Sequence, residues 1–269
     1  MKENPDPVRS FNIIQFVKSH PLFGDSEKGI CFLHRSGQEI VLYCQTDRMD
    51  SIHHLKGRVP VGLAYNPRKA VQVLSKADKK LGRLIKAVGP IQIDPPKRLN
   101  PFQALMRSIV YQQLSGKAAA TIYGRVLGLF PGQRSLKPEQ ILEIPMEMLR
   151  GAGMSNAKAR AVKDLAEKAM EGIVPTGARL RKMSDEVIVD RLTQVWGIGE
   201  WTVQMVLIFQ LGRSDVLPVK DLGVRKGYML TYGLDAMPEE GEMMDYCECW
   251  RPYRSVGSWY MWRAVDLYG

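Results

Sequence analysis

The chain has 269 residues, 45% of them hydrophobic, and its 38 lysines and arginines exceed its 28 acidic residues, for a formal charge of +10. This length supports one large domain or two smaller ones, each with its own core. The positive charge favours a polyanionic partner, and nucleic acid is the first candidate. No apolar run approaches the roughly 20 residues that span a bilayer, so we expect no membrane protein.

The opening residues, MKENPDPVRS, lack the apolar core of a secretion signal. We therefore expect a protein that is not secreted and works in the cytosol, associated with the nucleoid, or in the nucleus. The four cysteines fit such a compartment, because they form no CxxC pair and are too few for a disulfide scaffold of this size. They are Cys31, Cys44, Cys247 and Cys249.

The first 65 residues differ in pattern from the rest. GICFLHRS (29–36) and QEIVLYCQT (38–46) are short β-rich runs separated by Ser36 and Gly37, which predicts a hairpin or a small sheet. We predict a small α+β region of unknown role over 1–65, followed by a mainly α domain over 66–269.

Helical patterns dominate from residue 66 onward. Asn66 and Asn100 are each followed by proline, a pair typical of a helix cap and first turn. After Asn100, apolar residues recur at helical spacing and predict one buried stripe: Phe102, Leu105, Met106, Ile109 and Val110. The expected helices cover 66–88, 100–114, 117–130, 138–150, 156–171, 184–195, 200–211, 221–231 and 239–268.

Two segments place Gly-x-Gly between a helix end and a helix start: LRGAGMSNAKARAVKDLA (149–166) and VWGIGEWTVQMVLIF (195–209). We interpret each as a helix-turn-helix unit. Gly197 and Gly199 are free to adopt positive φ, so the turn around Ile198 can bring backbone amides against a phosphate. Glycine is also common in such loops for steric reasons alone.

Basic residues strengthen the phosphate interpretation, although each is individually typical of a solvated surface. The first Gly-x-Gly is followed by Lys158, Arg160 and Lys163, and the second by Arg213, Lys220, Arg225 and Lys226.

The hairpin VWGIGEWT, the helix after it, and the proline and aspartate of LPVKDLGVRKG (217–227) resemble the helix-hairpin-helix DNA glycosylase superfamily. The resemblance extends over about residues 70–269, including RSIVYQQLSGKAAATI and WRPYRSVGSWYMW. The chain is most similar to the 3-methyladenine DNA glycosylase II type, which excises alkylated bases. This resemblance implies the helix-hairpin-helix glycosylase fold, a monomer, and double-stranded DNA containing alkylated bases as partner in base excision repair.

The resemblance places Asp221 at the catalytic aspartate. A carboxylate there stabilises the oxocarbenium-like sugar as the base leaves, or orients the attacking water. Asp221 also fits a helix N-cap, and both roles are compatible. Lys220 departs from the acidic or small polar residue often found beside the aspartate, and we expect it to be solvated or to face a phosphate.

Relatives that also cut the DNA backbone carry a lysine two residues after the second hairpin glycine, where its amine attacks the sugar. That position is Trp201 here, so the resemblance implies a monofunctional enzyme that leaves an abasic site. Some relatives bind an iron–sulfur cluster through four C-terminal cysteines. Only Cys247 and Cys249 lie in that region, so no cluster and no cofactor is expected.

A cationic alkylated purine is already a good leaving group, so an aromatic pocket can suffice for its recognition. Trp201 and Trp262 match family positions for the pocket walls, with Met205 a weaker candidate; an ordinary core position is the alternative for the tryptophans. Gln113 and Leu114 match the wedge that fills the gap in the duplex, and the sequence leaves open which of them inserts.

No metal site is expected. Cys31, His34, Cys44 and His53 lack a standard zinc-finger spacing. Two other functions stay open: a glycosylase for a deaminated or oxidised base, because pocket shape decides the lesion, and a DNA-binding protein without catalysis, against which Asp221 argues.

Overall fold

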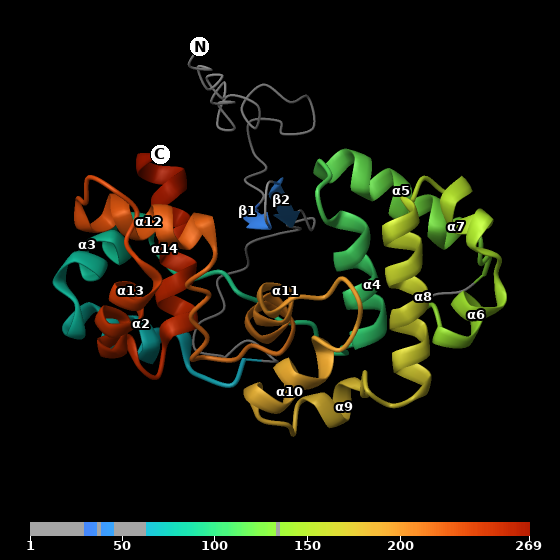
Figure 1. Cartoon of the computed structure of the whole chain (residues 1–269). Coiled ribbons are helices and arrows are strands. Elements are labelled where there is room, and N and C mark those ends of the chain that lie inside the picture. The colour runs from blue at the N-terminus through green and yellow to red at the C-terminus, as the bar shows by residue number, and fades with distance from the viewer. Residues whose placement is uncertain (1–29, 37–38, 46–62, 133–134) are drawn as a thin grey trace, which may run out of the picture.

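A computed structural model of the chain describes residues 30–36, 39–45, 63–132 and 135–269 (Figure 1). The described part is mainly helical, which confirms the predicted class. None of its helices is both long and apolar enough to cross a membrane.

Strands β1 (Ile30–Ser36) and β2 (Glu39–Gln45) pair antiparallel, with Cys31 opposite Cys44. The rest of 1–62, including His53, lies outside the described residues. The extent and role of the N-terminal region, and its boundary at residue 65, therefore stay predictions.

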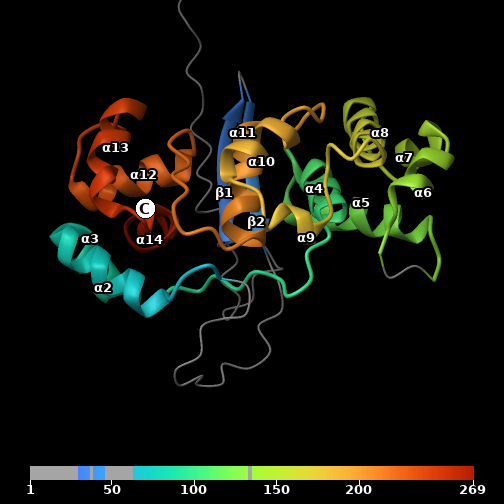
Figure 2. The same cartoon turned by 90° about the horizontal axis from the view of Figure 1, so that it is seen from below.

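The helices form two lobes with a third group between them (Figures 1 and 2). One lobe is built from the first and the last helices of the domain: α2 (Pro67–Ala77), α3 (Lys79–Val88), α12 (Leu222–Tyr232), α13 (Glu240–Tyr246), the 3-10 turn η2 (Cys247–Trp250) and α14 (Arg254–Tyr268). The other lobe contains α4 (Pro101–Tyr111), α5 (Gly116–Gly128), α6 (Pro138–Glu143), α7 (Met146–Gly151) and α8 (Asn156–Met170). Between them lie α9 (Gly177–Leu180), α10 (Asp185–Leu192), α11 (Glu200–Met205) and its π-helical continuation η1 (Val206–Gln210).

The predicted helix starts are confirmed by their hydrogen bonds. The Asn66 side chain accepts from the amides of Arg68 and Lys69, and that of Asn100 accepts from the amide of Gln103 at 3.1 Å. These bonds satisfy amides that have no partner inside the helix. All five residues of the stripe predicted after Asn100 are buried in the core.

Three predicted helices are wrong in length, because each is broken into two. The helix expected over 66–88 breaks at Asp78, which leaves helical geometry and caps α3 by accepting from Lys80 and Leu81. Those expected over 138–150 and 239–268 break near Pro145 and Pro252, since proline lacks the amide that a helix interior needs. The short helix α9 was not predicted.

The break at Asp78 is fixed from the far end of the chain. Its buried carboxylate accepts a hydrogen bond from the Tyr232 hydroxyl and another, at 3.0 Å, from the Trp250 indole. The N-terminal helices of this lobe are thus tied to its C-terminal ones.

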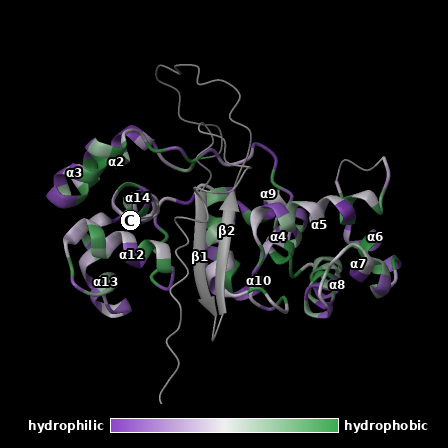
Figure 3. Ribbon diagram, turned by 90° about the horizontal axis from the view of Figure 1, so that it is seen from above, coloured by the Kyte–Doolittle hydropathy of each residue, from purple (hydrophilic) through white to green (hydrophobic). Residues whose placement is uncertain are grey.

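Helices α12 and α14 approach very closely. A Cβ atom built on Gly227 would lie 1.8 Å from the carbonyl oxygen of Met261, so only glycine fits there. Hydrophobic and hydrophilic residues are mixed along helices such as α3 and α8, as expected where one side is buried (Figure 3). The close α12–α14 contact brings the start of α12 beside Trp262.

Candidate catalytic and nucleic-acid site

Asp221 is the N-cap of α12 and is fully buried. Its Oδ1 accepts a hydrogen bond of 2.8 Å from the amide of Val224. The predicted capping role is therefore present.

Two indole groups enclose the Asp221 carboxylate. Trp201, at the start of α11, donates to Oδ2 at 2.7 Å, and Trp262 of α14 donates to Oδ1 at 2.8 Å. The two tryptophans are 6% and 3% exposed, and Met205, one turn along α11, is also buried. The structure thus brings together the predicted catalytic residue and the two predicted pocket tryptophans, both bonded to the carboxylate by their indole nitrogens.

Burial is the largest influence on the protonation of Asp221 and raises the pKa of its carboxyl group above 3.8. Hydrogen bonds from Trp262, Val224, Trp201 and Gly223 act in the opposite direction, because they stabilise the carboxylate. All four donors are neutral, so they stabilise the carboxylate without supplying a compensating positive charge.

Gly223 makes room for the bond between Trp262 and Asp221. A Cβ atom built there would lie 2.9 Å from Trp262 Cδ1 and 3.1 Å from Asp221 Oδ1. Glycine inside a helix costs stability relative to alanine, so its place in the first turn of α12 is a signal of close packing. Gly223 was not among the site residues predicted from the sequence.

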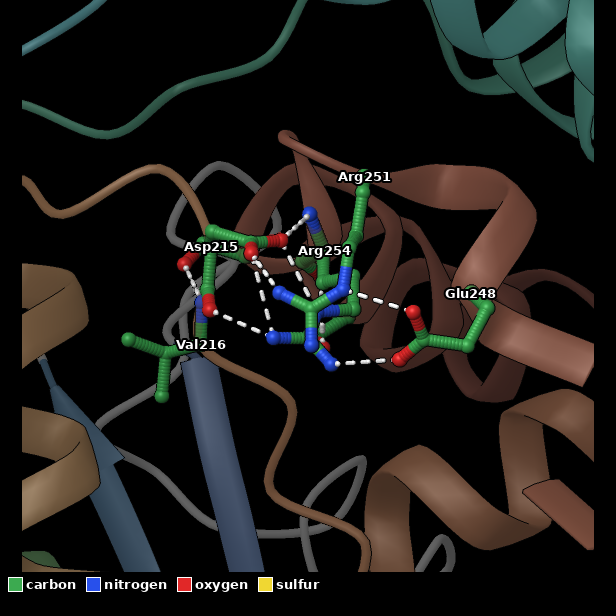
Figure 4. A network of polar contacts seen from close by, with 7 residues as sticks. Asp215, Val216, Glu248, Arg251 and Arg254 are labelled. Atoms are coloured by element: carbon green, nitrogen blue, oxygen red, sulfur yellow. Dashed lines mark hydrogen bonds and ion pairs between the residues drawn. The ribbon is translucent and has the colours of Figure 1, made fainter. Parts of the chain in front are cut away.

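The segment that leads into Asp221 is anchored to the beginning of α14 (Figure 4). Asp215 accepts hydrogen bonds from Arg254, at 2.8 Å from Nε to Oδ1, and from Arg251; Glu248 accepts from both arginines. Val216 follows Asp215, and its backbone amide donates to the Ser255 hydroxyl at 2.9 Å. The same helix carries Trp262, so these contacts fix Asp221 relative to its partner.

The hairpin has one glycine in the left-handed region, not two. Gly197 has φ +82°, as expected, but Gly199 has φ −94° and ψ 168°, which any residue can adopt. The expectation of positive φ at Gly199 is wrong because this residue is the extended N-cap of α11. Ile198 is buried, and its amide donates to Val195 inside the turn, so this amide is committed to the fold.

The N-terminus of α11 has no side-chain cap, since Gly199 offers none. Lys220 lies nearby: its ammonium is 3.7 Å from the Glu200 carboxylate in the first turn of that helix, and both side chains are exposed. The residue before Asp221 is thus paired with the first turn of α11.

The predicted wedge region lies against the hairpin. Gln113 is exposed and has φ +56°, and Leu114 is half-buried against the core. The preceding residue, Gln112, donates from Nε2 to the Gly197 carbonyl oxygen at 2.9 Å. This link joins two segments 85 residues apart in the chain and was not predicted from the sequence.

Several of the basic residues that had suggested phosphate binding are engaged within the fold. Lys158 donates to the carbonyls of Val110 and Gln112 at the end of α4, and Lys163 donates to those of Leu142 and Ile144 at the end of α6. These lysines satisfy carbonyls that a helix end leaves unpaired.

Two arginines are likewise engaged in the fold. Arg213 pairs with Asp185 at 2.9 Å, and Arg225 donates to the Pro238 carbonyl at 2.8 Å. Arg160 differs, because its guanidinium stacks over the exposed ring of Trp196 at 4.8 Å, next to the hairpin.

No group of three or more His, Cys, Asp or Glu within the described ranges is placed to hold a metal ion. Cys247 is buried and Cys249 is exposed. Burial raises the pKa of the Cys247 thiol, which keeps it protonated and unreactive.

Known proteins resemble this chain in sequence and in fold. The family described as HhH-GPD superfamily base excision DNA repair protein matches residues 106–252. DNA-3-methyladenine glycosylase 1 of Schizosaccharomyces pombe is 35% identical over 200 residues, which cover 74% of this chain and 88% of the relative.

Two solved structures agree with the sequence match. The 3-methyladenine DNA glycosylase of S. pombe in complex with abasic DNA superposes with a TM-score of 0.65 at 35% identity, covering 74% of this chain and 98% of that one. The DNA-3-methyladenine glycosidase of Bacillus halodurans superposes with a TM-score of 0.67 at 36% identity, covering 73% and 88%. The chain therefore belongs to the HhH-GPD superfamily of base excision DNA repair proteins, in its 3-methyladenine DNA glycosylase type.

Proposed function

We propose that this protein is a monofunctional DNA N-glycosylase that removes alkylated purines such as 3-methyladenine in base excision repair. The observation that carries the proposal is the Asp221 carboxylate, fully buried and held by the indoles of Trp201 and Trp262. Family membership supports the reaction class, because the relatives above are named as glycosylases of this type.

Asp221 acts on the sugar. As the bond between the base and C1′ breaks, positive charge develops on the sugar, and a carboxylate beside it stabilises that charge or orients the attacking water. Oδ1 accepts from both Trp262 and Val224, which occupies both lone pairs of that oxygen. We therefore assign Oδ2, which accepts from Trp201, to the sugar.

The leaving base needs little help when alkylation has made it cationic. Trp201, Trp262 and Met205 are the residues that we assign to its pocket, where aromatic faces favour a cationic ring. Trp201 also stands where relatives that cut the backbone have lysine, and the Lys220 ammonium lies by Glu200. Water is therefore the nucleophile, and the product is an abasic site.

DNA is held by its phosphates and opened by a wedge. The uncapped amides after Gly199, at the start of α11, are suited to a phosphate, and the net charge of +10 attracts the duplex. Gln113 or Leu114 fills the gap that the flipped base leaves. The protein acts as a monomer through residues 66–269, in the nucleus or in the cytosol at the nucleoid.

A panel of duplexes, each with one defined lesion, tests this function. The protein is incubated with each duplex and the released base is counted. Release of alkylated purines supports the proposal. Release of only a deaminated or oxidised base would shift the substrate class, and tight binding without any release would indicate a DNA-binding protein that has lost catalysis.

A further inference from the structure

We propose that Lys158 and Gln112 are positioning residues that hold the wedge turn, residues 112–114, in fixed register with the hairpin at Gly197. The inference rests on the proposed function and adds to it a brace that connects the two DNA-contacting segments.

The first contact of the brace is at the end of α4. The Lys158 ammonium donates to the carbonyl of Val110 at 2.8 Å and to that of Gln112. A helix end exposes carbonyls with partial negative charge, which favours a cation there. Burial lowers the pKa of Lys158 to about 8, which leaves the ammonium group mostly charged at neutral pH.

The second contact crosses to the hairpin. The Gln112 amide group donates to the Gly197 carbonyl at 2.9 Å. A Cβ atom built on Gly197 would lie 3.4 Å from the Cβ of Ala161, which stands three residues after Lys158 on α8. One face of α8 therefore supports both the wedge turn and the hairpin.

The turn needs this support because its backbone is strained. Gln113 has φ +56°, a left-handed conformation that is uncommon outside glycine. Such residues persist where the surrounding structure over-determines them. Lys158 donates to the backbone carbonyl of Gln112, the residue immediately before Gln113. The side chain of Gln112 is in turn bonded to Gly197, so Gln112 is held through both its backbone and its side chain.

The brace has a kinetic consequence. Backbone amides that bind phosphate contact any duplex, whatever its sequence. Base release also requires the wedge to lie at a fixed distance from this phosphate-binding site. Loss of the brace should therefore lower the rate of base release and leave the affinity for undamaged DNA almost unchanged.

Lys158→Met, Gln112→Leu and the double variant test the inference, with Lys163→Met as matched control. Lys163 makes the same kind of contact from the same helix, to Leu142 and Ile144 at the end of α6, and its replacement changes the charge equally. Each protein is assayed for single-turnover base release, affinity for an undamaged duplex, and thermal melting.

Each brace variant should release base about 10- to 100-fold more slowly, the scale of a misplacement of about 1 Å, with affinity for undamaged DNA within about twofold of wild type. Lys163→Met should keep the wild-type rate even where its melting temperature falls. Because both residues act through one brace, the double variant should be no slower than the slower single variant. Lys158→Arg, which keeps a charged donor, should recover part of the rate.

Three results would each overturn the brace. The folded brace variants could release base at the wild-type rate, Lys163→Met could lose as much rate as they do, or the losses of the two single variants could add in the double variant. A second readout does not need catalysis. The fluorescence of 2-aminopurine next to an abasic-site analogue should rise when wild type inserts its wedge, and rise less with the brace variants. A wild type that releases no base contradicts the proposed function, whereas equal fluorescence in wild type and variants contradicts the brace.

Discussion

The Trp262 indole donates a hydrogen bond of 2.8 Å to Asp221 Oδ1, although the two residues are 41 positions apart in the chain. Trp201 donates to the other oxygen. The carboxylate is therefore fixed in direction by two helices that it does not belong to, and its orientation depends on the space between them.

Gly223→Ala should disturb that orientation. The added Cβ would lie 2.9 Å from Trp262 Cδ1, so the indole must move away from Asp221. We expect base release to slow by about 10-fold or more, since catalytic groups lose much of their effect when displaced by about 1 Å. Single-turnover rates measure this.

The control for Gly223→Ala is Gly124→Ala, an exposed position in α5 where an added Cβ meets nothing within 4 Å. Alanine there should stabilise the helix by about 1 kcal/mol and leave the rate alone. A Gly223→Ala protein as fast as wild type would show that the Trp262 contact does not position the carboxylate.

Gly197→Ala and Gly199→Ala should differ. Gly197 has φ +82°, so alanine there carries backbone strain of about 1–3 kcal/mol, whereas Gly199 has φ −94° with open space at its Cβ position. We expect Gly197→Ala to weaken binding to damaged and undamaged duplexes alike, because phosphates carry no sequence information. Gly199→Ala should bind nearly as wild type.

Titration of both glycine variants with the two duplexes, after thermal melts have shown that they fold, measures this difference. If Gly197→Ala folds and binds both duplexes with wild-type affinity, the hairpin is only a connector between helices.

The pH dependence should report the burial of Asp221. Burial raises the pKa of its carboxyl group above 3.8, so base release should fail on acidification at a higher pH than for an ordinary aspartate. The sign for stability is opposite: between 3.8 and the raised pKa the native state binds more protons than the unfolded state, so the contribution of Asp221 to the free energy of unfolding falls as pH rises.

Rate–pH profiles, and denaturant unfolding of wild type and Asp221→Asn across this window, check both statements. An acid limb at the ordinary aspartate pKa would contradict the dominance of burial.

Borohydride should trap no covalent adduct between the protein and lesion DNA. The position of the attacking amine in relatives that cut the backbone is Trp201, whose indole nitrogen donates to Asp221. A trapped adduct would point to another amine, and Lys220→Met would be the first variant to test because Lys220 precedes Asp221.

Local signals predicted much of the fold. The caps at Asn66 and Asn100 and the buried stripe of α4 depend on neighbours within a few residues, which the sequence displays. The break at Asp78 was missed because its carboxylate is held by Tyr232 and Trp250, whose proximity is a property of the tertiary fold.

The candidate site likewise has residues that the sequence predicted and residues that depend on the tertiary fold. Asp221 and the hairpin were found through motif order, and the structure places Trp201 and Trp262 beside Asp221. The roles of Gln112 and Lys158 were not apparent, because both depend on carbonyl oxygens that only the folded backbone brings near.

The catalytic role of Asp221 is tested by measuring base release by wild type and Asp221→Asn from a duplex with one alkylated purine. Asparagine keeps an acceptor for the cap of α12 and removes the charge, so thermal melting should confirm folding and DNA affinity should be unchanged or slightly higher, since one negative charge near phosphate is gone. We predict release by wild type and none above background by Asp221→Asn. Wild-type release rates from the folded variant would contradict the assignment of Asp221 as the catalytic carboxylate.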